Sequence, residues 1–223
     1  MCSDGFLYCL YILLHHFMAV IVLAWPFVMF KTNYFTMCQF TCSMFTIIKR
    51  RLRNLGDGLD MIASNKVKSE LIKSIAVCVK MHQEALEFVS LLEDNYSFFL
   101  LLVLTVNAIG LSTIGFRFVA MAQSMEDNIQ CCAFLFGQVL YIYYLSSFDQ
   151  KLMDHSAYLF ESICAAKTYN FPPEMKPMVV LLMMRSNIVC RLSAGKLFFM
   201  TLENFANVMK TSFSYCTILL SLQ

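Results

Sequence analysis

The feature that most constrains this sequence is a set of three long runs without Asp, Glu, Lys or Arg. They cover residues 5–30, 95–116 and 128–148, which is 26, 22 and 21 positions. About 20 mostly apolar residues in an α-helix cross the hydrocarbon core of a bilayer. We therefore expect three membrane-spanning helices.

A fourth span is expected at the end of the sequence, although its charge-free run is shorter. Residues 211–223 carry no charge, and a helix of spanning length that starts near residue 197 includes Glu203 and Lys210. Only 7 Gly and 4 Pro among 223 residues leave few turns, which favours helices over a membrane β-barrel. The expected fold class is all-α, a polytopic membrane protein with about four spans.

Composition argues against several other classes of protein. Charged residues make up 14% of the chain, against about 25% in soluble domains, and a net charge of +2 gives no basic surface for nucleic acid. Ten Cys occur without a C-x-x-C pair, and the adjacent His15 and His16 would lie about 100° apart on a helix. No metal, cofactor or enzymatic motif is therefore expected.

The distribution of basic residues predicts the orientation. Residues 49–94 contain eight Lys and Arg and residues 149–196 contain six, whereas residues 117–127 contain one. Because cytoplasmic connections are enriched in Lys and Arg, the two long connections are expected inside and both chain ends outside. An outside start without a signal peptide suggests the C-terminal part of a longer protein, or an incomplete gene model.

Two of the spans should continue beyond the membrane as amphipathic helices. Apolar positions recur at steps of three and four residues in two segments, which predicts one buried face in each. The positions are Val67, Leu71, Ile75, Cys78, His82, Leu86 and Val89, followed by Leu152, Ser156, Leu159, Ile163 and Ala166. Pro172-Pro173 should end the second of these helices, Ser193-Ala194-Gly195 suggests a hinge, and Pro26 suggests a kink.

Five segments follow from these features. They are residues 1–48 (first span and inner extension), 49–94 (cytoplasmic loop and amphipathic helix), 95–148 (a hairpin of two spans), 149–195 (cytoplasmic helices) and 196–223 (last span). The apolar faces of the cytoplasmic helices need one another, or another subunit, to become buried.

The last span carries a polar stripe. At 100° per residue, one narrow sector of the helix contains Asn204, Asn207, Thr211, Ser214, Ile218 and Leu222. Such a stripe fits a water-filled ion pathway, with Ile218 and Leu222 as a hydrophobic gate near its outer end. The alternative is a stripe that bonds to neighbouring helices of its own bundle.

The C-terminal region resembles the signature of the insect odorant receptors. Residues 184–222 contain an Arg185-Ser186 pair, Leu192-x-Ala194-Gly195, Leu202-x-x-Phe205 with Lys210, and a closing Ser212-Phe213-Ser214-Tyr215. Residues 49–55, 78–86 and 154–158 also fit, so that the resemblance extends over nearly the whole chain.

The resemblance implies a seven-helix protein of which this chain holds helices four to seven, with the C-terminus outside. The seventh helix would be split into a cytoplasmic piece, residues 176–191, and a pore-lining piece, residues 196–222. Members of the family form tetrameric, odorant-gated, non-selective cation channels with a shared co-receptor, in the plasma membrane of olfactory neurons. The subunits of the tetramer meet mainly through a cytoplasmic anchor domain. Their spanning helices are surrounded by membrane lipid.

The family's odorant pocket lies in the outer half of the bundle, and part of it would lie in this chain. The candidate pocket residues for a volatile organic ligand are Tyr8, Tyr11, His15, Phe134, Leu135 and Gln138; packing between helices is the alternative role for each. Two other functions remain as alternatives, a gustatory-type receptor and a small-molecule membrane transporter. The transporter would call for discontinuous helices and an internal repeat, and the sequence shows no repeat.

Overall fold

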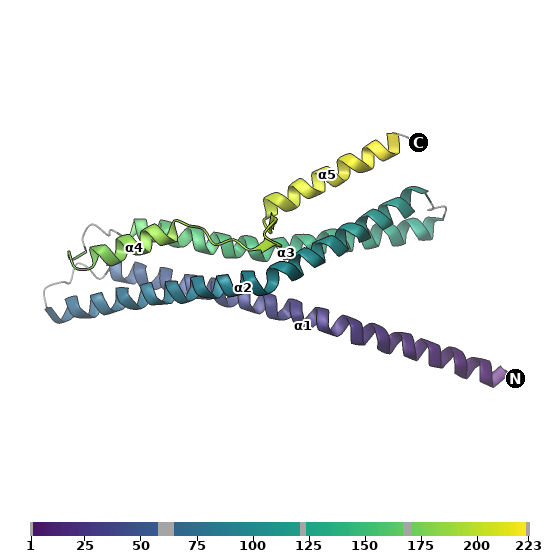
Figure 1. The fold of residues 1–223 in the computed structure, drawn as a ribbon, viewed down its shortest axis with the longest axis horizontal. Helices are drawn as coiled ribbons and strands as arrows, with labels where there is room; N and C mark the ends of the chain where they lie inside the picture. The colour runs from purple at the N-terminus through teal and green to yellow at the C-terminus, as the bar shows by residue number, and fades with distance from the viewer. Residues whose placement is uncertain (1, 58–64, 121–123, 167–170, 222–223) are drawn as a thin grey trace. The chain divides into compact units, whose positions relative to one another are not determined.

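The computed structural model describes residues 2–57, 65–120, 124–166 and 171–221. Long helices dominate this part of the chain (Figure 1). The elements are α1 (Cys2–Asp57), α2 (Asn65–Ala120), α3 (Met125–Ala165), α4 (Lys176–Ser186), β1 (Ser193–Ala194), β2 (Phe198–Phe199) and α5 (Leu202–Ser221). The all-α prediction is confirmed, with a pair of two-residue strands as its only strand structure among the described residues.

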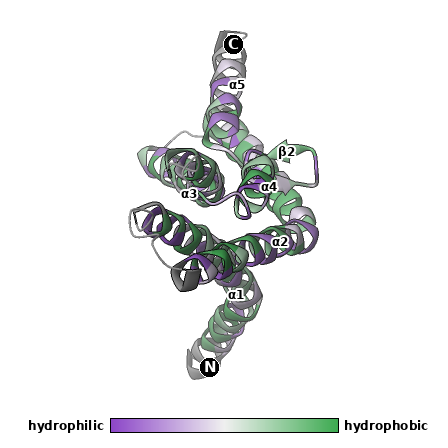
Figure 2. Ribbon diagram, turned by 90° about the vertical axis from the view of Figure 1, so that its left-hand side faces the viewer, coloured by the Kyte–Doolittle hydropathy of each residue, from purple (hydrophilic) through white to green (hydrophobic). Residues whose placement is uncertain are grey.

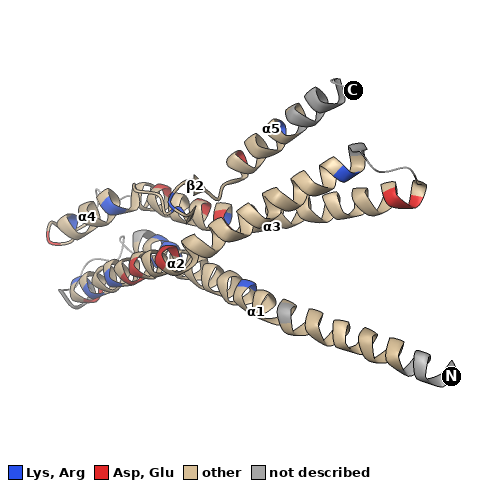
Figure 3. Cartoon of the chain, turned by 45° about the vertical axis from the view of Figure 1, so that its right-hand side comes forward, with Lys and Arg blue, Asp and Glu red and all other residues tan. Residues whose placement is uncertain are grey.

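Three helices in the described ranges are long and apolar enough to cross a membrane. These candidate spans are Tyr8–Leu55, Lys68–Phe118 and Met125–Ala165. They contain the charge-free runs 95–116 and 128–148 whole and residues 8–30 of the first run. In Figure 3 the charged residues of α2 gather on its first half, whereas Arg117 lies near its other end. The protein is therefore a multi-pass helical membrane protein.

The chain divides into two compact units, Met1–Met37 and Cys38–Gln223. The first unit is the initial part of α1, which passes through Pro26 without interruption. Nearly all its described side chains from Tyr8 to Met29 are exposed, and most of them are apolar. An apolar surface all round suits a helix surrounded by lipid or by other helices.

The second unit is built on helices that outlast the bilayer. At 1.5 Å per residue, the 56 residues of α2 extend over about 84 Å, against about 30 Å of hydrocarbon. The half of α2 that carries the charges packs with α4, with residues 38–57 of α1 and with residues 149–165 of α3 (Figure 1). We call these four segments the extramembrane bundle; hydrophobic and hydrophilic residues lie side by side on its helices (Figure 2).

The core of the extramembrane bundle has the spacing of a coiled coil. Side chains at successive steps of four and three residues are buried on each long helix, as expected where helices pack at a shallow angle. They are Cys38, Thr41, Phe45, Ile48 and Leu52 of α1; Leu71, Ile75, Cys78, His82, Ala85, Val89 and Leu92 of α2; and Leu152, Ser156, Leu159 and Ile163 of α3.

The predicted faces of α2 and α3 are therefore mostly confirmed. Leu86 and Ala166 are only half-buried, and the side chain of Val67 lies outside the described residues. In α1 the polar side chains of Gln39, Ser43 and Thr46 are exposed. Their helix satisfies the two hydroxyls locally, since Ser43 donates to Gln39 O at 2.9 Å and Thr46 to Cys42 O at 2.8 Å.

The segment between α4 and α5 differs from the expectation. Helix α4 ends at Ser186 rather than residue 191, and α5 begins at Leu202 rather than residue 196. Between them lies an antiparallel hairpin in which Ser193 pairs with Phe199 and Ala194 with Phe198. The predicted hinge is thus a short hairpin, with Leu192, Ser193 and Ala194 all buried.

Candidate functional site

The polar last helix is positioned by the hairpin that precedes it. The Asn204 side chain donates from Nδ2 to Phe199 O at 2.8 Å, and the Asn204 N–H donates to Thr201 Oγ1 at 3.2 Å. Thr201 thus acts as an N-cap for the first turn of α5. The Leu202 N–H donates to Gln150 Oε1 on α3 at 3.4 Å, so the start of α5 contacts both the hairpin and α3.

One face of α5 packs on α3. Leu202, Phe205, Met209 and Ser212 are half-buried and share a sector of the helix. The ring of Phe205 meets that of Tyr143 on α3 edge-on, with centroids 5.8 Å apart. This face is the packed side of α5 within the chain.

The predicted polar stripe points away from that packed face. At 100° per residue, Asn207, Thr211 and Ser214 lie about 150° around the helix from the side that meets α3, and all three are exposed. Thr211 donates to Asn207 O of its own helix at 2.9 Å. Asn204 is half-buried because the hairpin binds it.

The two gate candidates cannot be placed in the same way. Ile218 belongs to α5, but its side chain lies outside the described part, and Leu222 lies outside the described residues altogether. The gate stays a prediction.

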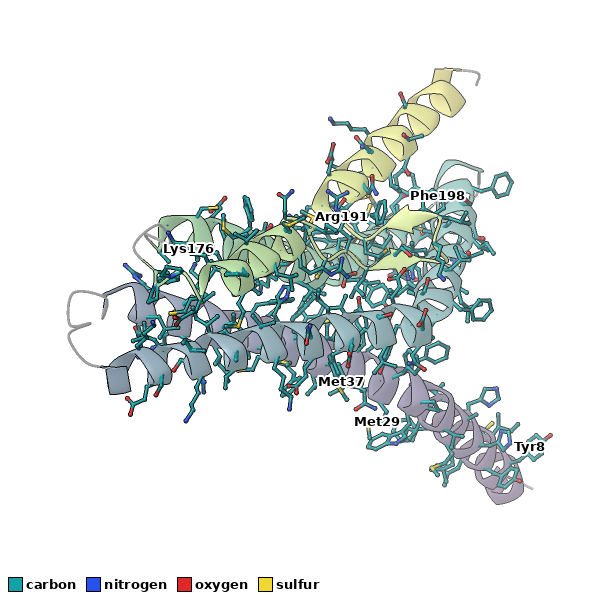
Figure 4. The ribbon with its side chains drawn as sticks, turned by 60° about the vertical axis from the view of Figure 1, so that its left-hand side comes forward. Tyr8, Met29, Met37, Lys176, Arg191 and Phe198 are labelled. Carbon is teal, nitrogen blue, oxygen red and sulfur yellow. The ribbon has the colours of Figure 1, made fainter. Side chains whose placement is uncertain are left out.

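The pocket candidates fall into two groups. Tyr8, Tyr11 and His15 belong to the first unit, where all three are exposed, and the rings of Tyr11 and His15 lie 6.5 Å apart. The Tyr8 side chain projects from the end of α1 (Figure 4). Phe134, Leu135 and Gln138 belong to α3 in the second unit; Phe134 is exposed and the other two are half-buried.

Gln138 has an unusual environment among these residues. Its Oε1 atom is buried, and no hydrogen-bond donor in the described part of the chain reaches it. A buried acceptor without a donor costs free energy of about 1–3 kcal/mol. Gln138 therefore has an unused acceptor on the half of α3 that carries few charges.

The structure also contains a cavity that the sequence did not indicate. It has a volume of about 230 Å³ and lies between α1 and α3 of the extramembrane bundle. Its lining residues are Cys38, Gln39, Cys42, Ser43, Thr46, Phe148, Lys151 and His155. None of the predicted pocket residues lines it, so it is separate from the proposed odorant pocket.

His82 is a buried ionisable group in the bundle. His82 lies more than three helical turns before residue 95, where the charge-free run of α2 begins. Only 3% of its surface is exposed, beside the ring of Phe45 at 6.2 Å between centroids. Burial lowers the pKa of His82 to about 4, and the positive charge of Arg185 contributes in the same direction.

Sequence reasoning missed the residues that hold the hairpin. Glu93 of α2 accepts two hydrogen bonds from Ser193, one from the N–H at 2.8 Å and one from the hydroxyl. The only sequence signal was the Leu-x-Ala-Gly motif around Ser193, and nothing linked it to Glu93. Within the described ranges no cluster of His, Cys, Asp and Glu has the arrangement of a metal site.

Fold and site together define a class: a multi-pass helical membrane protein with long extramembrane helices and a separate last helix that exposes a polar stripe. The family model described as 7tm Odorant receptor matches residues 3–213. The chain therefore belongs to the odorant receptor family, a family of receptors and channels, and the resemblance drawn from its motifs is confirmed.

Two relatives show how much of such a protein the chain represents. It is 22% identical over 194 residues to Odorant receptor 13a of Drosophila melanogaster, covering 82% of this chain and 46% of that protein. It also resembles the insect olfactory receptor OR5 from Machilis hrabei, solved in complex with eugenol, with a TM-score of 0.57 and 16% identity, over 82% of this chain and 46% of that one. The chain thus spans about half the length of both proteins.

Proposed function

We propose that this chain forms the pore-lining and extramembrane part of an odorant-gated, non-selective cation channel subunit. The subunit detects volatile organic molecules together with a shared odorant co-receptor, in a hetero-tetramer in the plasma membrane of olfactory sensory neurons. Membership in the odorant receptor family supports the sensory role.

The polar stripe of α5 is the observation that carries the channel mechanism. Asn207, Thr211 and Ser214 are exposed on the side opposite the contact with α3. In hydrocarbon, amide and hydroxyl groups prefer a protein interior or water. Four such helices around a common axis would line an aqueous route, with Asn204 at its inner end and Ile218 and Leu222 as the hydrophobic constriction.

The ligand is proposed to bind in the outer half of the bundle. Tyr8, Tyr11, His15, Phe134, Leu135 and Gln138 offer rings, aliphatic surface and a few polar groups, the usual lining of a site for a small apolar molecule. The unused Oε1 of Gln138 would accept a hydrogen bond from a ligand hydroxyl. The remaining walls would come from other helices of the subunit.

Current recordings test the proposal. The full receptor chain and an odorant co-receptor are expressed in cultured cells and exposed to a panel of volatile compounds that includes eugenol. We expect cation current with both subunits present and none when either is omitted. Flux of a volatile or metabolite without channel-like current would favour the transporter alternative instead.

A single substitution in the polar stripe tests the pore assignment in the same recordings. Thr211→Leu removes a hydroxyl from the proposed pore wall, and unitary conductance should fall by roughly twofold or more because the wall loses a polar contact for hydrated ions. Ala206→Leu is the matched control, since Ala206 is exposed about 140° around α5 from Thr211. Equal conductance in the two variants would contradict the pore assignment.

A further inference from the structure

The hairpin between α4 and α5 is fixed to α2 by a compact set of hydrogen bonds. Both oxygens of the Glu93 carboxylate accept from Ser193, one from its N–H at 2.8 Å and the other from its hydroxyl. One helical turn further along α2, Ser97 O accepts from the Gly195 N–H at 2.9 Å. We call Glu93, Ser97, Ser193 and Gly195 the hairpin latch.

The turn of the hairpin is shaped to fit against α2. Gly195 and Lys196 have φ values of +63° and +59°, and the Leu197 N–H donates to Ala194 O at 3.1 Å. A Cβ atom on Gly195 would lie 2.6 Å from Leu101 Cδ2 of α2. The positive φ favours glycine at position 195, and the Leu101 side chain leaves little room there for a Cβ atom.

The Ser193 hydroxyl connects the latch to the turn. Its Oγ donates to Glu93 and at the same time accepts from the Lys196 N–H at 3.1 Å. Hydrogen bonds to an ionised carboxylate are stronger than those between neutral groups. Loss of the Glu93 carboxylate would therefore loosen the turn as well as the contact with α2.

The latch lies between two parts of the proposed machinery. Beyond Leu100, α2 lies beside the first part of α3, which carries Phe134, Leu135 and Gln138 (Figure 1), and Arg117 of α2 pairs with Asp127 of α3 at 3.2 Å. On the other side, the hairpin leads directly into α5 through the bond from Asn204 Nδ2 to Phe199 O. Figure 4 shows Arg191 and Phe198 in this connecting segment, next to the start of α5.

We propose that Glu93 is a positioning residue for gating: through Ser193 it couples the position of α2 to the orientation of the pore-lining helix α5. This inference rests on the proposed function. A ligand that shifts the outer halves of α2 and α3 would move the Glu93 carboxylate, and the hairpin would transmit that movement to the polar stripe.

The test measures the position of α5 directly in the full receptor chain with its co-receptor. Asn207→Cys provides a thiol on the exposed stripe, and its rate of modification by a charged maleimide is followed by mass shift, with the parent chain as background. Glu93→Ala, Ser193→Ala and the double variant are compared with Glu87→Ala, an exposed carboxylate on the same helix. Odorant-evoked current is recorded from the same variants.

We expect Glu93→Ala and Ser193→Ala each to change the modification rate and the half-maximal odorant concentration by about tenfold. The double variant should add little to Glu93→Ala, because that substitution already removes both hydrogen bonds from Ser193, whereas Ser193→Ala removes only the bond from its hydroxyl. Glu93→Gln keeps one acceptor and should give an intermediate value, whereas Glu87→Ala should match the parent.

The outcomes separate the latch from the proposed function. Unchanged modification rates in Glu93→Ala would overturn the coupling, whatever the currents show, and so would fully additive effects in the double variant. If the parent shows no odorant-evoked current but Glu93→Ala alters the modification rate, the latch stands as a device that positions α5 and the channel proposal fails.

Discussion

His82 is a polar residue in the core of the extramembrane bundle. It occupies a core position of α2 in step with Ile75, Cys78 and Val89, so a polar ring takes a place where an apolar side chain would be expected. Burial favours its neutral form, and Arg185 adds to that preference. The bundle should therefore be sensitive to the protonation of this one ring.

The pH dependence of stability follows from the lowered pKa. Because His82 has a pKa of about 4 in the folded protein and about 6.5 when unfolded, the unfolded chain binds the proton more tightly. The contribution of His82 to the free energy of unfolding is fully present above about pH 6.5. It is lost as the pH drops towards 4, by about 3 kcal/mol over the whole window.

Thermal unfolding in detergent between pH 7.5 and pH 4 measures this effect. His82→Leu should remove most of the loss of melting temperature in this window, although titrating carboxylates will contribute in both proteins. Parallel pH profiles for the parent and His82→Leu would show that the histidine is not buried in its neutral form.

At the scale of elements, the two halves of α2 lie in different environments along one uninterrupted helix. Its first half presents a coiled-coil face to the extramembrane bundle, and its second half enters the charge-free run. No Gly or Pro interrupts the helix between these halves. A rigid helix of this kind transmits displacement along its length.

Substitutions along the bundle half of α2 should follow its buried face. Ile75 is fully buried, and Ile75→Ala leaves a cavity that should cost about 2–5 kcal/mol of unfolding free energy. Val77 is 42% exposed, so Val77→Ala should change the stability by no more than about 0.5 kcal/mol. Thermal unfolding of the two variants in detergent compares them, and similar losses would contradict the assigned helix face.

The elements also show which features sequence reasoning can reach. The buried faces of α2 and α3 were predictable because a repeat of three and four residues is a local pattern that packing requires. The hairpin was not, because two-residue strands have no periodicity and gain their stability from Glu93, which lies 100 residues away from Ser193 in the chain. The end of α4 at Ser186 and the start of α5 at Leu202 were missed because the hairpin between them was not expected.

At the scale of the whole molecule, the three strong spans and the family were predictable from sequence. The spans rest on the absence of charge, and the family rests on the motifs around Arg185, Leu192 and Ser212. The ligand pocket was less accessible to prediction, because a pocket depends on how separate helices converge. Tyr8, Tyr11 and His15 remain candidates on the first part of α1, where nearly all the described side chains from Tyr8 to Met29 are exposed.

The central claim is that the exposed stripe of α5 borders water inside an assembled channel, and thiol scanning of α5 tests it most directly. Single cysteines are placed at residues 204, 207, 211 and 214, and at residues 205 and 209 on the face towards α3. Charged, membrane-impermeant thiol reagents are applied to the receptor and co-receptor during odorant stimulation. The account predicts rapid modification and altered current along the stripe, with slow reaction at the two α3-facing positions. Equal protection of all six positions, in open and closed channels alike, would contradict it.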